Sequence, residues 1–549
     1  FAASLAKIAY NKFGNRPMSE ANMLVTRKWL VKYLAEDEFK DLRICDKNLA
    51  IDRALFLSFV PTKDFQAMKM ATTSKAWKDR VDAEGVFGKV FRLVTGSKDL
   101  DILQGCPTEA IGTGCEWTKA IPLFDINHGG SSSRIFDRAP IGDRGKPVPD
   151  FTHDRLRWET TVGCPKERKF VRVSHVASDV DIIPFNNDLA TLHRAVVERV
   201  FLVKSGDGFA SPPRPSEGHF DDMLRPVFEL LKPILPSTAP CSHQQFVDSY
   251  RGRKKMNYQQ ALDEINEGHS NLKRDSHLNV FVKFEKTDHT TKKDPVPRVI
   301  SPRNPKYNIR VGRYLKPLEE RLFRSLGGLF GHRTVIKGLN ATRSAEVLRE
   351  KWEMFRNPVA VGLDASRFDQ HVSLEALRWE HRVYLNCFPQ SKHRKRLANL
   401  LKLQEINSAT GYTPDGKLSY TVKGVRMSGD MNTSLGNCVL MCSMIKAYSL
   451  YKGVELQLAN NGDDCVVIME SSDLSKFSEG LFEWFLDLGF NMAIEKPVWE
   501  FGEIEFCQTK PIFDGFGWIM CRNPFTAIVK DSVMMKPFAS GNEFKGWLD

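Results

Sequence analysis

The cysteines do not form the pairs that a zinc or redox site requires. The 11 cysteines are scattered over 549 residues, without a Cys-x-x-Cys pair and without zinc-type spacing. Cys438 and Cys442 lie four residues apart in an apolar, helix-like segment, where buried free thiols are expected. The cysteine pattern therefore excludes a zinc site of the usual spacing and indicates a reducing compartment.

Long hydrophobic runs are also lacking. The best apolar run, residues 54–60, is far too short to cross a membrane, and no stretch has the pattern expected of a signal peptide. The sequence begins at Phe1 rather than Met, so we expect a processed product or an excerpt, with any membrane anchor upstream. Gly112–Lys119 fails the spacing of a phosphate-binding P-loop, so we do not expect a helicase.

Composition and length indicate a large globular protein. A chain of 549 residues is too long for one ordinary core, so two to four domains or subdomains are expected. The hydrophobic share of 42% is sufficient for a sizeable interior. The net charge of +12 and the pI near 9.0 favour polyanionic partners such as nucleic acid, although charge alone is weak evidence.

Two breaks divide the chain. Residues 1 to about 125 contain helix-like segments such as 21–33 and no catalytic constellation. A Gly-, Ser- and Pro-rich stretch at 128–149 is typical of a linker, and 205–218 is a second break. The pattern after it predicts a helix over 220–235.

The stretch from Lys283 to Arg343 is strongly basic, with fifteen Lys or Arg residues against five acids. A solvated basic face is one interpretation. Phosphate contacts with base stacking are the other, because Arg298 lies in an apolar, extended setting and aromatic residues alternate with the charges. Those aromatic residues are Phe281, Phe284, Tyr307 and Tyr314.

An acidic hairpin is predicted between residues 456 and 469. Both arms are apolar, and Asn461-Gly462 is the dipeptide that a type I′ turn favours. Asp463 and Asp464 would lie together at the tip, where two carboxylates repel each other unless a cation neutralises them. Oxygen ligands suit Mg²⁺ or Mn²⁺ rather than zinc, so we expect a metal site here.

A second acidic element follows a predicted buried strand, residues 359–363. The strand leads directly into Asp364, and Asp369 follows five residues later. Asp364 and Asp463 could hold two Mg²⁺ ions about 3.5–4 Å apart, the arrangement for in-line phosphoryl transfer. Asp221-Asp222 provides an internal control, because these acids begin the helix at 220–235, complement its dipole and are assigned no chemistry.

A polar loop at 425–437 separates the two acidic elements. Ser428-Gly429 permits a tight loop, and Asn437 would lie one turn inside the following helix, where its amide could read a sugar hydroxyl. An ordinary loop with a helix cap is the alternative. Three polar residues could supply that cap: Asn432, Thr433 and Ser434.

From about residue 187 to its end, the chain resembles the RNA-dependent RNA polymerases of positive-strand RNA viruses, in particular tombusvirus-like plant virus replicases. The matching runs are Asp364 to Asp369 (motif A), Ser428 to Asn437 (motif B), Gly462-Asp463-Asp464 (motif C), Lys496 (motif D), Phe506-Cys507-Gln508 (motif E), and Lys283, Glu285 and Arg298 (motif F). Residues 250–255 resemble a fingers segment of the same group.

The resemblance implies an α+β fold shaped as a right hand, with a palm built on an antiparallel sheet. The implied parts are an N-terminal, mostly helical or mixed replicase region with a linker (1–150), fingers with a basic nucleotide tunnel (151–355), a palm (356–515) with an inserted fingers segment (376–424), and the start of a thumb (516–549). The family usually continues into a full thumb, so we expect part of the thumb to be missing.

The resemblance also implies a role for each motif residue. The metal ligands would be Asp364, Asp463 and Asp464, with Lys496 as a general acid for pyrophosphate; a surface lysine is the alternative for Lys496. The nucleotide would be bound by Lys283, Glu285, Lys292, Lys293, Arg298, Asp369, Ser428, Gly429, Thr433 and Asn437. RNA would be bound by Arg251, Arg253, Lys254, Phe506, Cys507 and Gln508.

The predicted function is therefore template-directed RNA synthesis from ribonucleoside triphosphates with Mg²⁺ or Mn²⁺. Expected partners are template and product RNA and a membrane-anchored auxiliary replicase protein, at the cytosolic face of virus-remodelled membranes in the host cytoplasm. A reverse transcriptase is disfavoured, because Asp369 and Asn437 leave polar room for a 2′-hydroxyl where a bulky gate would be expected. An inactive, RNA-binding replicase subunit is the second alternative.

Overall fold

The computed structural model of the chain describes residues 155–163, 165, 167–172, 180–206, 208–292 and 294–535, together with Trp29–Leu30 and the backbone of 137–138. The predictions for residues 1–150, including most of the 21–33 helix and the 128–149 linker, lie outside the described residues, and so does Lys293. The chain divides into two compact units, and the larger comprises Arg138–Phe170 and Val180–Ala527. Every other predicted site residue belongs to this larger unit.

An antiparallel sheet of order β14–β15–β11–β16 forms the middle layer of the larger unit. Its strands are β11 (Pro358–Ala365), β14 (Leu456–Asn461), β15 (Asp464–Glu470) and β16 (Met492–Ile494). Alternate residues enter different cores: Val361 and Val467 belong to one hydrophobic cluster, and Ala360 and Val466 to another. Because both faces are covered, β11 before Asp364 and β15 between Asp464 and Glu470 are continuously apolar rather than alternating.

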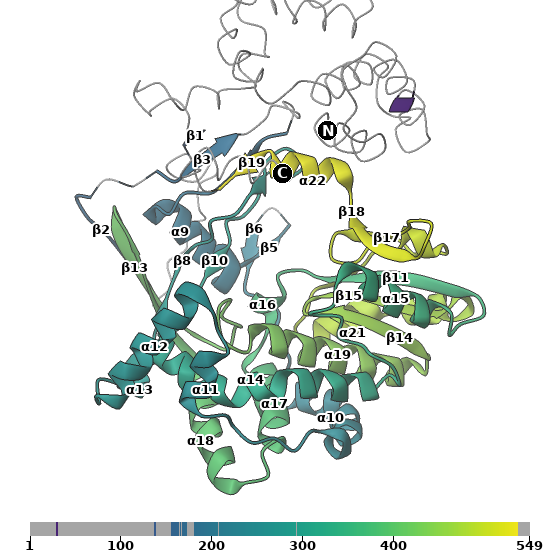
Figure 1. Cartoon of the computed structure of the whole chain (residues 1–549), viewed down its shortest axis with the longest axis horizontal. Coiled ribbons are helices and arrows are strands. Elements are labelled where there is room, and N and C mark those ends of the chain that lie inside the picture. The colour runs from purple at the N-terminus through teal and green to yellow at the C-terminus, as the bar shows by residue number, and fades with distance from the viewer. Residues whose placement is uncertain are drawn as a thin grey trace, which may run out of the picture. The chain divides into compact units, whose positions relative to one another are not determined.

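Helices cover the first face of this sheet (Figure 1) and build the larger core with it. They are α10 (His219–Leu231), α14 (Pro305–Gly328), α17 (Leu374–Asn386), α18 (Ser391–Leu401), α19 (Thr433–Lys452), α20 (Leu474–Ser478) and α21 (Leu481–Asp487). Helix α19 is apolar almost all round and is buried along most of its length, including Cys438 and Cys442. This confirms the two cysteines as buried free thiols.

The second face packs against α15 (Ala341–Trp352) and a hairpin of β17 (Thr509–Phe513) and β18 (Trp518–Arg522). Phe501 joins them, since its ring centroid lies 4.7 Å from that of Trp518 in β18 and 6.0 Å from that of Trp352 in α15.

A second sheet, of order β2–β13–β12–β7, unites distant parts of the chain. Its strands are β2 (Leu156–Thr160), β7 (Leu278–Asn279), β12 (Ile406–Thr413) and β13 (Gly416–Lys423). Helix α9 (Leu189–Val196) and the π-helix η5 (Val197–Phe201) contribute to the core beside it. A Cβ on Gly416 would lie 2.5 Å from a methyl carbon of Leu189, so the close packing of helix on sheet requires glycine there.

Short strand pairs and helices complete the larger unit. The pairs are β4 (Ile182–Ile183) with β9 (Thr287–Asp288), β5 (Val203–Ser205) with β6 (Gly208–Ala210), and β8 (Phe281–Val282) with β10 (Val299–Ile300). The helices are α11 (His243–Asp248), α12 (Gly252–Asn266), α13 (Leu272–Asp275), α16 (Phe368–His371) and the 3₁₀ turns η6 (Lys232–Ile234), η7 (Lys402–Gln404), η8 (Ser471–Asp473) and η9 (Phe501–Glu503).

The remaining elements lie at the unit boundary or in the smaller unit. They are β1 (Asp137–Arg138), β3 (Lys169–Arg172), α22 (Pro524–Asp531) and β19 (Val533–Met534), with Val533–Met534 antiparallel to Val171–Arg172. In the described part of the chain, no helix is both long enough and apolar enough to cross a membrane.

The helix predicted at 220–235 forms, but it ends earlier. Helix α10 stops at Leu231, and the chain tightens into η6, because Pro233 supplies no backbone N–H. Asp221 and Asp222 lie in the first turn, as expected for acids that complement the helix dipole.

Of the four aromatic residues that were expected to stack on bases, two are buried in the core, so for these two the prediction is wrong. Phe281 and Phe284 are partly exposed, but Tyr307 and Tyr314 are buried. Both tyrosines lie on the core side of the amphipathic helix α14, where the hydroxyl of Tyr307 donates to the carbonyl of Leu400.

Candidate active site

Three carboxylates gather where β11 and β15 meet. Leu363 pairs with Cys465 in the antiparallel ladder, so the next positions along the two strands are Asp364 and Asp464. Opposed residues of an antiparallel pair present their side chains on the same face. Asp463 lies in the turn that precedes β15.

The turn of this hairpin differs from the predicted one by one residue. Asn461 pairs with Asp464, so Gly462 and Asp463 are its central residues rather than Asn461 and Gly462. Gly462 has a φ of +93°, the positive angle that a type II′ turn places at its first central position. The side chain of Asn460 explains the shift: its Nδ2 donates to Gly462 O at 2.7 Å, and its Oδ1 accepts from Gly462 N at 3.2 Å.

The carboxylates at this hairpin repel one another. Burial raises the pKa of Asp464, and the negative charges of Asp463 and Asp364 raise it further. No lysine or arginine of the described residues forms an ion pair with any of these three carboxylates. Uncompensated negative charge of this kind favours a bound cation.

Glu495 belongs to the same acidic group and was missed in the sequence. Burial raises its pKa, and Asp364 is the largest charge contribution, followed by Glu505 and Asp464. A Cβ on Gly362 would lie 1.9 Å from a carboxylate oxygen of Glu495, so this side chain lies over β11. Its position directly after the edge strand β16 was the available signal.

Asp369 and Asn437 meet as the sequence predicted. The Nδ2 of Asn437, one turn inside α19, donates to Oδ1 of Asp369 at 2.9 Å. Burial raises the pKa of Asp369, while the bond from Asn437 and the charge of Arg426 act in the opposite direction. The pair forms a small polar site beside the acids.

The loop that carries Ser428 and Gly429 is fixed from the side of β10. The carbonyl of Ser428 accepts from the backbone N–H of Ser301 at 2.7 Å. Gly429 has a φ of +123°, and a Cβ there would lie 3.2 Å from the backbone of Ser301 and Pro302. Glycine is therefore required for this approach.

A buried ion pair secures the same loop. Asp430 Oδ1 accepts from Nε of Arg303 at 2.5 Å, and the Arg303 guanidinium also donates to Asn407 Oδ1. The hydroxyl of Thr433 donates to the carbonyl of Met427 at 2.9 Å. The expected cap by Asn432 is wrong: this residue occupies the N-cap position of α19, but its side chain donates to Glu380 Oε1 instead.

Basic residues line β8 and β10 next to this loop. Glu285 Oε2 lies 2.7 Å from Nζ of Lys283 and 3.5 Å from a guanidinium nitrogen of Arg298, so one acid holds both cations. Two further arginines near Arg298, namely Arg199 and Arg367, were missed in the sequence. Burial, then the charges of Arg367 and Arg298, lowers the pKa of Arg199 to about 10, which indicates that three guanidinium groups are close together.

Comparison with known proteins decides the family. Residues 156–549 match a family described as viral RNA-dependent RNA polymerase. This chain belongs to the viral RNA-dependent RNA polymerases. The resemblance found in the sequence is therefore confirmed, and with it the enzyme class and the right-hand polymerase fold of the family.

Several plant virus proteins, each named RNA-directed RNA polymerase, are similar to this polymerase. That of oat chlorotic stunt virus (isolate United Kingdom) is 54% identical over 555 residues, covering 100% of this chain and 69% of that protein. That of tobacco necrosis virus (strain A) is 44% identical over 386 residues, 70% of this chain and 52% of the other. That of tomato bushy stunt virus (strain Cherry) is 43% identical over 376 residues, 68% and 45%.

The motif E segment of the polymerase forms a strained turn against the acidic hairpin. Cys507 and Gln508 have φ of 53° and 60°, between two backbone hydrogen bonds that join Phe506 and Thr509. This is the type I′ geometry, which is unusual without Gly, Asn or Asp. Asn461 Nδ2 lies 3.2 Å from Sγ of Cys507, and Phe506 is buried. The predicted RNA contact of this segment stays a prediction.

Other predicted residues lie on the surface of the polymerase. Lys496 follows β16 and is exposed, as are Lys292, Arg251 and Arg253. Lys254 lies over the ring of Tyr250, 4.7 Å from its centroid. Their predicted roles likewise stay predictions.

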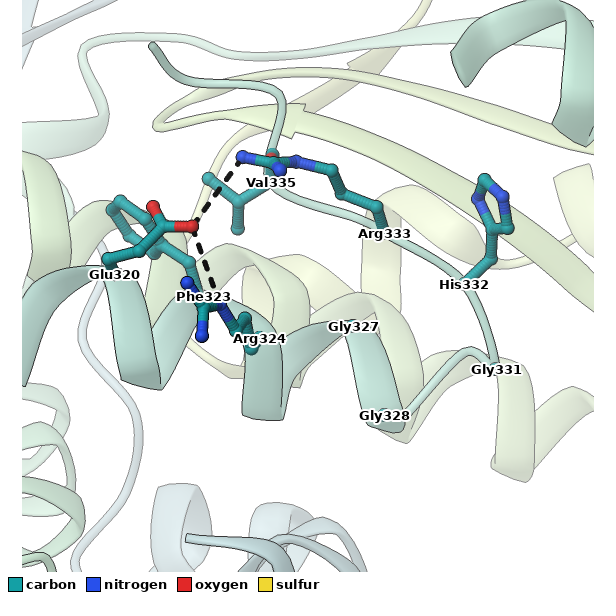
Figure 2. Close-up of a pocket in the computed structure, with 9 residues that line it drawn as sticks. All are labelled: Glu320, Phe323, Arg324, Gly327, Gly328, Gly331, His332, Arg333 and Val335. Carbon is teal, nitrogen blue, oxygen red and sulfur yellow. Dashed lines mark hydrogen bonds and ion pairs between the residues drawn. The ribbon is translucent and has the colours of Figure 1, made fainter. Parts of the chain in front are cut away.

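A pocket of ≈ 360 Å³ lies at the end of α14, and none of the acids predicted to be catalytic lines it (Figure 2). Glu320 lies between Arg324 and Arg333 there, with nitrogen–oxygen distances of 3.6 and 3.8 Å. The chain leaving this pocket extends the central sheet, since Thr334 O accepts from the backbone N–H of Asn460. This segment therefore holds the β14 arm of the acidic hairpin in place.

The hairpin offers carboxylate oxygens, the ligand type that Mg²⁺ and Mn²⁺ prefer. Among the described residues, no group of three His, Cys, Asp or Glu side chains is close enough to enclose one ion. Mg²⁺ typically takes one or two carboxylates and completes its shell with water and substrate phosphate, so an open set of carboxylates is appropriate.

Proposed function

We propose that this chain synthesises RNA on an RNA template from ribonucleoside triphosphates, releasing pyrophosphate and replicating a positive-strand viral genome. One observation carries the proposal: the carboxylates of Asp364, Asp463 and Asp464 gather at paired strand ends, with the bonded pair Asp369–Asn437 beside them. The relatives named RNA-directed RNA polymerase support it.

The parts of the hand are assigned as follows. The central sheet with α10, α14, α17 and α19 would be the palm, and the second sheet with β8 and β10 would be fingers. The hairpin β12–β13 pairs with β2 and β7, which supports its assignment as a fingers segment inserted in the palm. The hairpin β17–β18 would lead into the thumb.

Asp364, Asp463 and Asp464 would hold the divalent metal. When bound, Mg²⁺ would activate the attacking hydroxyl and offset charge on the phosphates. Lys283 and Arg298 would bind the triphosphate through charge-assisted hydrogen bonds, with Glu285 fixing their orientation. Lys496, exposed next to Glu495, would protonate the leaving pyrophosphate.

Asp369 and Asn437 would recognise the ribose of the incoming nucleotide. Only one oxygen of Asp369 accepts the bond from Asn437, and its other oxygen accepts no hydrogen bond from the described residues. That second oxygen could accept from a 2′-hydroxyl, the group that separates RNA from DNA substrates.

We also propose, from the resemblance, that the polymerase acts at the cytosolic face of virus-remodelled membranes with a membrane-anchored auxiliary replicase protein. Co-flotation of the tagged chain with host membranes, with and without other viral proteins, would test this. Flotation that does not depend on any viral protein would argue against the auxiliary partner.

The decisive experiment is incorporation of labelled ribonucleotides by the purified chain on a short RNA template with Mg²⁺. We expect Asp463→Asn to abolish incorporation and to leave RNA affinity nearly unchanged, because affinity should come from Lys and Arg. Asp222→Asn is the control, since Asp222 also belongs to an Asp-Asp pair, but its carboxylate forms an ion pair with Arg225 on the surface of α10. It should retain activity.

Three other outcomes would reject parts of the proposal. An Asp463→Asn variant that keeps most activity would refute the assignment of the metal ligands. Preference for deoxynucleotides would indicate a reverse transcriptase. RNA binding without incorporation by the unaltered chain would indicate an RNA-binding subunit.

A further inference from the structure

A buried ion pair lies directly behind the proposed ribose site. The guanidinium of Arg426 donates to both carboxylate oxygens of Glu380, and their side chains are only 1% and 0% exposed. Arg426 lies two residues before Ser428, and Glu380 is on α17. Neither residue was assigned a role from the sequence.

Hydrogen bonds run from this pair to the ribose site in one direction and into the core in the other. Arg426 Nε donates to Asn437 Oδ1 at 3.0 Å, and Asn437 Nδ2 donates to Asp369 Oδ1 at 2.9 Å. Behind the pair, Asn432 Nδ2 donates to Glu380 Oε1 at 2.8 Å, and Gln404 donates to Asn432 Oδ1. The network thus continues without a break from Asp369 to Gln404.

The network leaves Asn437 one orientation. An amide group offers an oxygen that accepts and a nitrogen that donates, and the two ends are similar in shape. Arginine can only donate and ionised aspartate can only accept, so a flipped Asn437 would lose both bonds. Arg426 therefore directs the Asn437 amide nitrogen toward Asp369.

We propose that Arg426 and Glu380 are positioning residues for ribose selection, an inference that rests on the proposed function. Glu380 holds Arg426, Arg426 fixes the amide of Asn437, and Asn437 occupies one oxygen of Asp369, leaving the other for the 2′-hydroxyl. Neither Arg426 nor Glu380 touches the substrate in this scheme.

Stability alone does not explain why a charged pair stands here. Replacing a buried ion pair by apolar residues of similar volume is often neutral or stabilising. Burial alone would raise the pKa of Glu380, but the charge and hydrogen bonds of Arg426 outweigh it and hold the pKa below its ordinary value. Beyond the ion pair itself, Arg426 donates to Asn437, and Glu380 accepts from Asn432.

The neighbouring helix is shaped to admit the pair. A Cβ on Gly436 would lie 2.4 Å from Nη2 of Arg426 and 2.5 Å from Oε1 of Glu380. Glycine in a helix interior costs stability relative to alanine, so its presence immediately before Asn437 requires a packing reason. The space for the ion pair supplies that reason, and Gly436→Ala would disturb the pair from a third side.

The test measures nucleotide discrimination, which a loss of folded protein does not change. For each variant, kcat/KM is measured for CTP and for 2′-deoxy-CTP on the same RNA template, and the ratio is taken. We expect Arg426→Lys and Gly436→Ala to lower this ratio about tenfold, the size of one lost charge-assisted hydrogen bond. Equilibrium dialysis gives the ratio of the two dissociation constants without requiring turnover.

The double variant Arg426→Met with Glu380→Leu separates positioning from stability. It removes both charges together, so we expect it to fold, yet it leaves Asn437 without its donor and should lower the ratio as well. Lys306→Met is the matched control: Lys306 is a buried cation bonded to Glu264 and His269 O, and it contacts neither Asp369 nor Asn437. Its ratio should equal that of the unaltered chain.

The outcomes distinguish this inference from the proposed function. An unaltered chain that incorporates CTP, with an unchanged ratio in all three test variants, would overturn the positioning role alone. A chain that binds CTP without incorporating it, and loses its binding preference in the variants, would overturn RNA synthesis and keep the positioning role. A chain that neither binds nor incorporates CTP would overturn both.

Discussion

Asn460 offers the sharpest test of how the catalytic hairpin is held. Its side chain is fully buried and bonds both backbone groups of Gly462, the residue that begins the turn carrying Asp463. Asn460→Ala would leave a buried N–H and a buried C=O of Gly462 without partners. The turn would then relax toward water, and Asp463 would move with it.

The size of the effect follows from those two groups. An unsatisfied buried polar group costs about 1–3 kcal/mol, and the turn can partly rehydrate, so we expect a loss of about 2–4 kcal/mol in the free energy of unfolding. A displacement of a catalytic group by about 1 Å can cost about a hundredfold in rate. We therefore expect kcat to fall by about that factor, with RNA affinity unchanged.

Asn461→Ala is the matched control, because it removes the same side chain one position along. Asn461 is only half-buried, and its amide contacts Sγ of Cys507 rather than the turn backbone. Urea unfolding and single-turnover incorporation over a range of Mg²⁺ concentrations would compare the two. An Asn460→Ala chain with normal kcat, or an Asn461→Ala chain equally impaired, would refute the reasoning.

Two further predictions concern stability. Burial lowers the pKa of Lys351 from 10.5 to about 7, so the unfolded chain binds more protons between those values and stability should rise with pH across that window. Lys351→Met should therefore have a higher free energy of unfolding than the unaltered chain below pH 7. This difference should shrink by up to about 4–5 kcal/mol as the pH rises toward 10.5. Urea unfolding at several pH values would measure it, and a difference that does not change with pH would contradict the prediction. Gln508→Gly should raise stability by about 1 kcal/mol, because glycine adopts the positive φ of 60° without strain; a lower melting temperature would show that the turn is not strained.

The strands that carry the acids could be predicted because their pattern is local. The apolar run that leads into Asp364 lies within β11, which extends beyond it at both ends, and the two apolar arms of the predicted hairpin form β14 and β15. The exact turn could not be predicted. Asn-Gly favours one register, but the buried amide of Asn460 bonds Gly462 and selects another, and the local pattern does not reveal that burial.

The basic stretch shows why charge counts mislead in a folded chain. Arg303 and Lys306 are as basic as Arg298 in the sequence, yet they are buried with Asp430 and Glu264 as structural partners. Their partners lie 127 and 42 residues away, respectively, in the chain. Which cations face a substrate therefore depends on long-range packing that periodicity does not reveal.

Side-chain contacts in the 425–437 loop could be anticipated only where both partners were recognised in the sequence. Asp369 and Asn437 were both singled out, and they are bonded. Asn432 was expected to cap α19, the usual task of such a residue at a helix start, but Glu380 takes its amide. Glu380 lies in a helix with no motif of its own, so the competing partner was invisible in the sequence.

These contacts also bear on how the proposed nucleotide site keeps its shape before substrate arrives. Arg298 immediately precedes β10, and the chain after β10 continues into Ser301 and Arg303, which bond Ser428 O and Asp430 in the loop leading to Asn437. The buried pair Arg303–Asp430 and the bond from Ser301 to Ser428 thus form a hydrogen-bonded framework that joins the segment after Arg298 to the loop leading to Asn437. Such a framework holds donors in place without reorganisation during reaction, which is where preorganised sites gain most of their rate. Loosening Arg303 should therefore disturb triphosphate and ribose recognition together, whereas loosening Arg426 should disturb ribose recognition alone.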